Sequence, residues 1–121
     1  MSPLLAGRFG AFAGPAAPAW WPRIEAAYSE PHRRYHTLAH LEAMFDEAAP
    51  FEPLARPLEW AIWFHDFVYD PRSAVNEEKS AVVAREALAE LGEPEAVIRR
   101  SAQLILATRH TALESASESG D

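Results

Sequence analysis

The chain has 121 residues, of which 49% are hydrophobic and 24% charged, a composition typical of one folded globular domain rather than of a disordered or membrane-resident protein. With 18 acidic and 11 basic residues its formal net charge is −7, which argues against general nucleic-acid binding. The absence of cysteine excludes disulfides and thiolate metal ligands, so any metal must be held by His, Asp and Glu side chains.

The first part of the chain is rich in Ala, Gly and Pro, and Arg8 interrupts any apolar run long enough for a signal peptide. Residues 1–18 are therefore predicted to be a poorly ordered segment. The folded domain is expected over residues 19–112, and residues 113–121 form a polar tail. No transmembrane helix is predicted, and a cytoplasmic location is the default expectation.

Apolar residues at helical spacing predict five helices in the remainder of the chain. Thr37 is a plausible N-cap for the second helix and Asn76 for the fourth, while Gly92 marks a helix end. The predicted helices cover about residues 19–29, the segment between residues 37 and 50, and residues 58–68, 76–91 and 95–108. A buried strand is the competing interpretation of "WAIWFHDFVY" at 60–69, because aromatic and β-branched residues also suit strands. Together the helices predict an all-α bundle.

Two histidines, His36 and His40, are four positions apart and would share one face of a helix. Their imidazole nitrogens could then approach one metal ion, or one ion and a bound substrate. This spacing alone is weak evidence, and a surface or capping role is about twice as probable for an isolated pair.

His65 and Asp66 strengthen the case for a metal, because they lie inside the apolar run "WAIWFHDFVY". A carboxylate in such surroundings needs a compensating charge, which a bound cation would supply. Adjacent helical residues diverge by about 100°, so the pair would act together best where a helix ends. The alternative is structural: Asp66 caps its own turn and His65 fills a gap in the core.

Three blocks of sequence in this order resemble the HD-domain superfamily of metal-dependent phosphohydrolases, in particular a bacterial branch of predicted HD phosphohydrolases. The blocks are "YHTLAH" at 35–40, "WFHDFVYDP" at 63–71 and "NEEKSA" at 76–81. The resemblance implies that His40, His65 and Asp66 bind a divalent metal ion and that His36 acts as a general acid. It does not transfer a role to Glu77 and Glu78, which serve either the start of a helix or a function behind the metal ligands.

The resemblance implies hydrolysis of a small phosphorylated substrate by water activated at a divalent ion, with Mn, Mg, Co, Ni, Fe or Zn all compatible with His and carboxylate ligands. Histidine titrates near neutral pH, which suits His36 to protonating a leaving group. Arg33 and Arg34 could orient the substrate phosphate, although an exposed basic turn is the more probable role for at least one of them.

HD proteins use a further, distal aspartate as a metal ligand, and this chain ends at "SESGD", so Asp121 is not assigned that role. The expectation is that the chain is a C-terminal truncation or that its site is incomplete. A non-catalytic or regulatory HD-like module with an incomplete metal site is therefore the alternative function. A bundle that lacks helices would expose an apolar face, which favours a homo-oligomer. Oxidative chemistry at a di-iron site ranks last, because it needs more His and carboxylate ligands.

Overall fold

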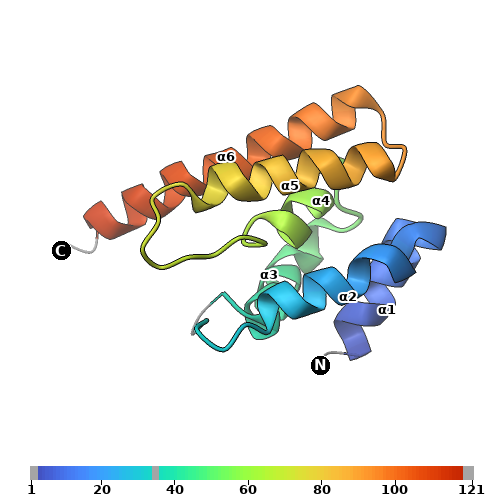
Figure 1. Cartoon of the computed structure of the whole chain (residues 1–121), viewed down its shortest axis with the longest axis horizontal. Coiled ribbons are helices and arrows are strands. Elements are labelled where there is room, and N and C mark those ends of the chain that lie inside the picture. Colours follow the sequence, from blue (N-terminus) through green and yellow to red (C-terminus); the bar gives the residue numbers. More distant parts are fainter. Residues whose placement is uncertain (1–2, 34–35, 119–121) are drawn as a thin grey trace. The chain divides into compact units, whose positions relative to one another are not determined.

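The structure, a computed structural model, describes the backbone of residues 3–33 and 36–118 and, of these, the side chains as far as Thr108. Within these residues the chain forms six α-helices and two short 3₁₀ helices and contains no strand (Figure 1). The prediction of an all-α fold is confirmed, and all five predicted helices are present.

Contacts divide the chain into two units, Met1–Leu54 and Ala55–Asp121. The boundary falls inside the segment 19–112 that the sequence predicts to be a single helical domain. The N-terminal unit contains the helices α1 (Pro3–Ala13), η1 (Gly14–Ala16), α2 (Ala17–Tyr28), α3 (Leu38–Ala48) and η2 (Ala49–Phe51). The C-terminal unit contains α4 (Arg56–Phe64), α5 (Asn76–Glu90) and α6 (Glu95–Glu118).

The prediction of a poorly ordered segment over residues 1–18 is wrong, because most of this segment forms α1. Leu5 and Phe9, four residues apart on one face of the helix, are both buried. The ring of Phe9 lies 6.0 Å from that of Trp21 in α2, and the two helices pack against each other. Burial of these two anchors outweighs the low helix propensity of the glycines in α1, which is a tertiary effect that composition does not reveal.

The apolar stripes of α2 and α3 are buried as their spacing predicts. Trp20, Ile24 and Tyr28 are buried in α2, and Leu41 and Phe45 are buried in α3. Helix α2 begins two residues earlier than predicted, so that Pro22 lies inside the helix rather than in its first turn. Thr37 occupies the N-cap position of α3 as predicted, with extended backbone but without a side-chain capping bond.

The strand interpretation of residues 60–69 is wrong, since α4 extends to Phe64 and a turn follows it. Every residue of this helix from Glu59 onward is buried. The one charged member of that run, Glu59, accepts a 3.2 Å hydrogen bond from Nε1 of Trp63 one turn later. Because α4 ends at Phe64, four residues before the predicted end, His65 and Asp66 lie just beyond the helix.

Helices α5 and α6 form a hairpin and lie side by side in Figure 1. Small residues allow them to approach closely: Ser80 and Ala84 of α5 and Ser101 and Ala102 of α6 are all buried. Gly92, with a φ angle of 78°, ends α5 as predicted. Its amide donates to the carbonyl of Ala89, and the next amide donates to Leu88, the two bonds of a Schellman motif.

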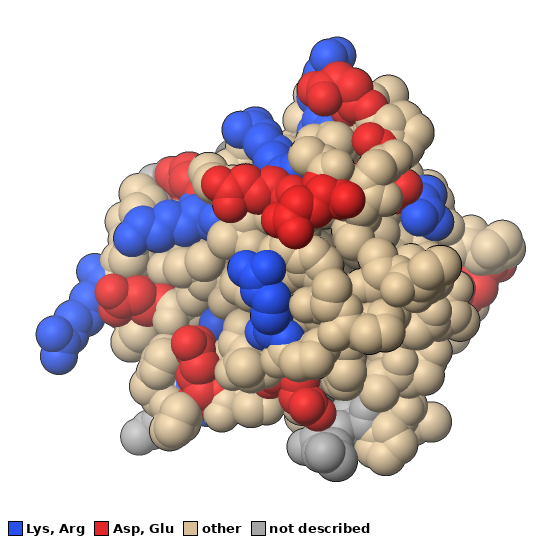
Figure 2. Space-filling view, turned by 45° about the vertical axis from the view of Figure 1, so that its right-hand side comes forward, with Lys and Arg blue, Asp and Glu red and all other residues tan. Residues whose placement is uncertain are grey.

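Among the residues described, no helix combines the length and the apolar character needed to cross a membrane. On the face shown in Figure 2, the Lys and Arg side chains stand singly among Asp and Glu side chains. The formal net charge of the whole chain is −7.

Candidate metal centre

The three predicted metal ligands and the predicted general acid fall into two pairs, one in each unit. His36 and His40 belong to the N-terminal unit, and His65 and Asp66 belong to the C-terminal unit. The local geometry of each pair is set by its own unit.

His65 is held at the C-terminal end of α4 by its backbone and by its ring. Its amide donates to the carbonyl oxygen of Ala61 at 2.8 Å, and its Nδ1 lies 2.8 Å from the carbonyl oxygen of Ile62. Since a carbonyl only accepts, Nδ1 carries the proton in this contact. The side chain is buried, with 7% of its surface exposed. A backbone carbonyl on one ring nitrogen is one of the usual ways in which proteins orient a metal-binding histidine.

The other ring nitrogen of His65, Nε2, lies 3.0 Å from Oδ2 of Asp66. In the neutral ring with Nδ1 protonated, Nε2 carries a lone pair, which faces a lone pair of the carboxylate oxygen. Two acceptors repel each other, so a proton or a cation is needed between them. Two ligands at right angles on one divalent ion, with bonds of about 2.1 Å, lie about 3.0 Å apart. The donor set therefore fits a divalent ion. An imidazolium–carboxylate ion pair satisfies the same distance, and a bound ion would replace its proton.

The end of α4 at Phe64 makes this arrangement possible. Adjacent residues are predicted to act together best where a helix ends, and His65 is the C-cap residue of α4. The amide of Phe67 donates to the carbonyl of Phe64 at 3.0 Å, which closes a turn around Asp66. Asp66 is partly exposed at this turn.

His36 and His40 are close to each other but do not share a helix. His40 lies in the first turn of α3, whereas His36 lies in the bend that precedes the N-cap. Their ring centroids are 5.9 Å apart and their planes are inclined by 78°. The expectation of one helical face is therefore wrong in detail, although the bend brings the two partly exposed imidazoles together.

The side chain of Arg33 is fully buried, which its place in a basic run of the sequence does not predict. Its Nε donates to Oε1 of Glu30 at 2.8 Å, and its Nη1 donates to the carbonyl oxygen of His36 at 3.0 Å. The guanidinium also lies 5.1 Å from the ring centre of Tyr28. These contacts hold the bend that carries His36, and they favour a positioning role over the substrate-binding role or an exposed basic turn. Arg34 lies outside the described residues, as does Asp121.

Glu77 and Glu78 lie in the first turn of α5, where the sequence places them, and both are partly exposed. The prediction that Asn76 caps this helix is wrong: Val75 is the N-cap residue, and Asn76 is the first helical residue. The side chains of Asn76 and Ser80 instead bond the chain that follows Asp66. This function is not predicted from the sequence, where its only signal is the spacing of four between Asn76 and Ser80.

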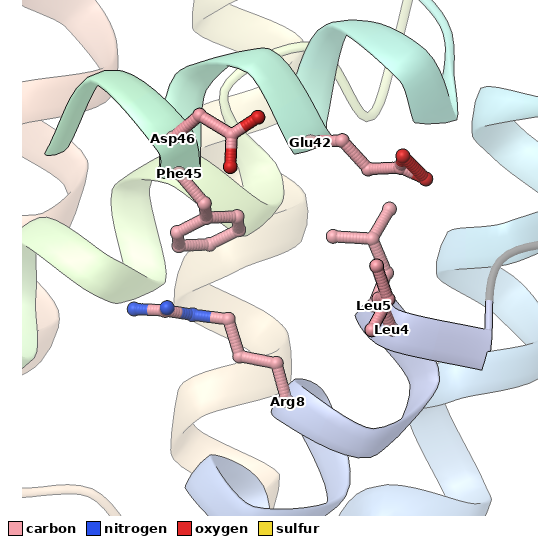
Figure 3. A pocket seen from close by; sticks show the side chains of 6 residues that line it. All are labelled: Leu4, Leu5, Arg8, Glu42, Phe45 and Asp46. Carbon is pink, nitrogen blue, oxygen red and sulfur yellow. The ribbon is translucent and has the colours of Figure 1, made fainter. Parts of the chain in front are cut away.

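A separate pocket of about 260 Å³ lies in the N-terminal unit between α1 and α3 (Figure 3). The guanidinium of Arg8 lies 4.0 Å from the ring centre of Phe45 and pairs with Glu52 at 2.9 Å. The carboxylates of Glu42 and Asp46 project from α3, and Leu4 and Leu5 complete the lining. None of the residues predicted for the metal site lines this pocket.

No protein-family model, curated protein or solved structure matches the chain. Membership of the HD-domain superfamily therefore stays a prediction. Its basis is the three sequence blocks.

Proposed function

We propose that the chain is a metal-dependent phosphohydrolase of the HD type that acts on a small phosphate mono- or diester, with nucleotides as the first class to test. The observation that supports it most directly is the pair in the C-terminal unit. His65 is fixed through Nδ1 and turns Nε2 toward Oδ2 of Asp66 at 3.0 Å. This is a donor pair in which one nitrogen is already oriented by the backbone.

In this proposal His65 and Asp66 hold a divalent ion, and His40 is a further ligand. Such an ion supplies charge that binds a phosphoryl oxygen and acidifies the attacking water. His36, whose ring contacts that of His40, donates a proton to the oxygen of the leaving group. Arg33 maintains the bend that carries His36 through its bond to the carbonyl of that residue.

Metal analysis of the purified chain tests the proposal, with Mn, Mg, Co, Ni, Fe and Zn offered separately. We expect one or more of these ions to bind and to raise the unfolding temperature, because a ligand that binds only the folded state stabilises it. Asp66→Asn and His65→Ala should abolish binding. His32→Ala is the matched control, since His32 is exposed and its Nε2 lies 3.8 Å from Oε1 of Glu30.

Hydrolysis is then measured on a generic phosphodiester, a phosphomonoester and a set of nucleotides with the ion that binds. If no ion binds and none changes the unfolding temperature, the metal hypothesis is wrong. Binding without turnover of any of these esters would favour the alternative, a non-catalytic or regulatory HD-like module.

A further inference from the structure

We infer that Asn76 and Ser80 are positioning residues which clamp the chain directly after Asp66 and thereby hold the His65–Asp66 pair in the geometry that binds a metal. The metal part of this inference rests on the proposed function. The clamp itself rests on four hydrogen bonds within the C-terminal unit.

The hydroxyl of Ser80 bonds both backbone groups of one loop residue, Val68. Its Oγ accepts the amide of Val68 at 2.9 Å and lies 3.3 Å from the carbonyl oxygen of Val68, to which it donates. The serine is fully buried, so both bonds form away from competing water. Val68 is therefore fixed two residues after Asp66.

The side-chain amide of Asn76 bonds both backbone groups of a second loop residue, Asp70. Its Oδ1 accepts the amide of Asp70 at 3.1 Å, and its Nδ2 donates to the carbonyl oxygen of Asp70 at 2.9 Å. The carboxylate of Asp70 accepts the amide of Arg72 at 2.9 Å, which begins the turn back into α5. Asp70 thus joins the clamp to the turn.

Asn76 and Ser80 are four residues apart in α5, which is about 6 Å along the helix axis and places them on one face. The loop residues that they bond, Asp70 and Val68, are two residues apart. One face of α5 therefore bonds both loop residues.

The clamp restricts the movement of Asp66, because the backbone is hydrogen-bonded close to this residue on both sides. On one side the amide of His65 is held by the carbonyl of Ala61 at 2.8 Å. On the other side Val68 is held by Ser80. Only Asp66 and Phe67 lie between these anchors, and the Phe67 amide is itself bonded to Phe64 at 3.0 Å. Loss of the two hydrogen bonds between Ser80 and Val68 would let the Asp66 carboxylate move away from Nε2 of His65.

The first test is amide hydrogen exchange, read residue by residue on the full chain without added metal. We expect Ser80→Ala to speed exchange of the Val68 amide by at least about tenfold, and Asn76→Ala to do the same for the Asp70 amide. Ser101→Ala is the matched control. Ser101 is equally buried, but it bonds Val97 in its own helix and does not reach the loop. Unchanged exchange of both loop amides in the two variants would overturn the clamp.

The second test is titration of wild type and variants with Mn²⁺, at a temperature at which circular dichroism shows each to be folded. Ser80→Ala and Asn76→Ala should weaken Mn²⁺ binding about 10- to 100-fold, the usual cost of removing a group that supports metal ligands. Ser101→Ala should leave it within about threefold. If Ser80→Ala does not fold, Asn76→Ala decides the matter, because Asn76 lies at the helix start outside the core. Equal affinity in all three variants would overturn the positioning role, whereas a wild type that ignores Mn²⁺ would overturn the proposed function and leave the exchange test to decide the clamp.

Discussion

Nε1 of Trp60 donates a 2.6 Å hydrogen bond to Oε1 of Glu93, which joins the middle of α4 to the turn between α5 and α6. Glu93 occupies this place because the Schellman motif at Gly92 reverses the chain immediately before it. The same carboxylate oxygen pairs with Nε of Arg56 in the first turn of α4. The side chain of Glu93 therefore joins the turn between α5 and α6 to α4, the helix that leads to His65.

Removal of this carboxylate should destabilise the C-terminal unit. We expect Glu93→Ala to lower the free energy of unfolding by about 1–2 kcal/mol, mostly through the buried indole bond, because Arg56 is half exposed and its ion pair is screened. Urea unfolding followed by tryptophan fluorescence measures the change. Glu90→Ala, at an exposed position of α5, is the control and should stay within about 0.5 kcal/mol. Equal effects of the two substitutions would contradict the role of Glu93.

Two glycines should respond to alanine in opposite directions. Gly92 has a φ of 78°, which an L side chain rarely adopts, and Gly92→Ala should cost about 1 kcal/mol through backbone strain alone, since an added Cβ would meet no atom within 4 Å. Gly7 lies inside α1 with the same free space, and Gly7→Ala should add about 0.5–1 kcal/mol by helix propensity. Thermal unfolding of the two variants measures both signs. A stabilised Gly92→Ala would show that the turn is not held as described.

Even a conservative substitution of Arg33 should destabilise the N-terminal unit. Lysine keeps the charge but cannot reach Glu30 and the carbonyl of His36 together with a planar fork, so Arg33→Lys should cost about 2–3 kcal/mol. It should also weaken the nuclear Overhauser contact between the His36 and His40 rings. Arg85→Ala, an exposed arginine in α5, is the control and should change neither quantity. An unaltered ring contact in Arg33→Lys would rule out a positioning role for this arginine.

The proposed roles of His36 and His65 predict different effects of their substitution on kcat and on metal content. His36→Ala should lower kcat by about 10²- to 10⁴-fold while metal content is unchanged, because a general acid is lost but no ligand is. His65→Ala should remove both metal and activity. Metal analysis alongside steady-state hydrolysis of a phosphodiester distinguishes the two. Loss of metal from His36→Ala would mean that this residue is a ligand rather than a proton donor.

The sequence by itself determined the helical class and the position of five helices, because apolar residues at a spacing of three and four are a local signal of a buried helix face. It also determined the end of α5 at Gly92, where the required φ is a property of one residue. The apolar surroundings of Asp66 were readable in the same way, because they are neighbours along the chain.

Only the tertiary structure decided the rest. Helix α1 forms because Leu5 and Phe9 find buried places, and the early end of α4 depends on how the following turn is bonded. The fully buried guanidinium of Arg33 and the loop contacts of Asn76 and Ser80 likewise depend on where backbone groups lie in space. A polar side chain can cap a helix, face water or bond a loop at nearly equal local cost, so the choice is made by whichever partner the packed chain brings within about 3 Å.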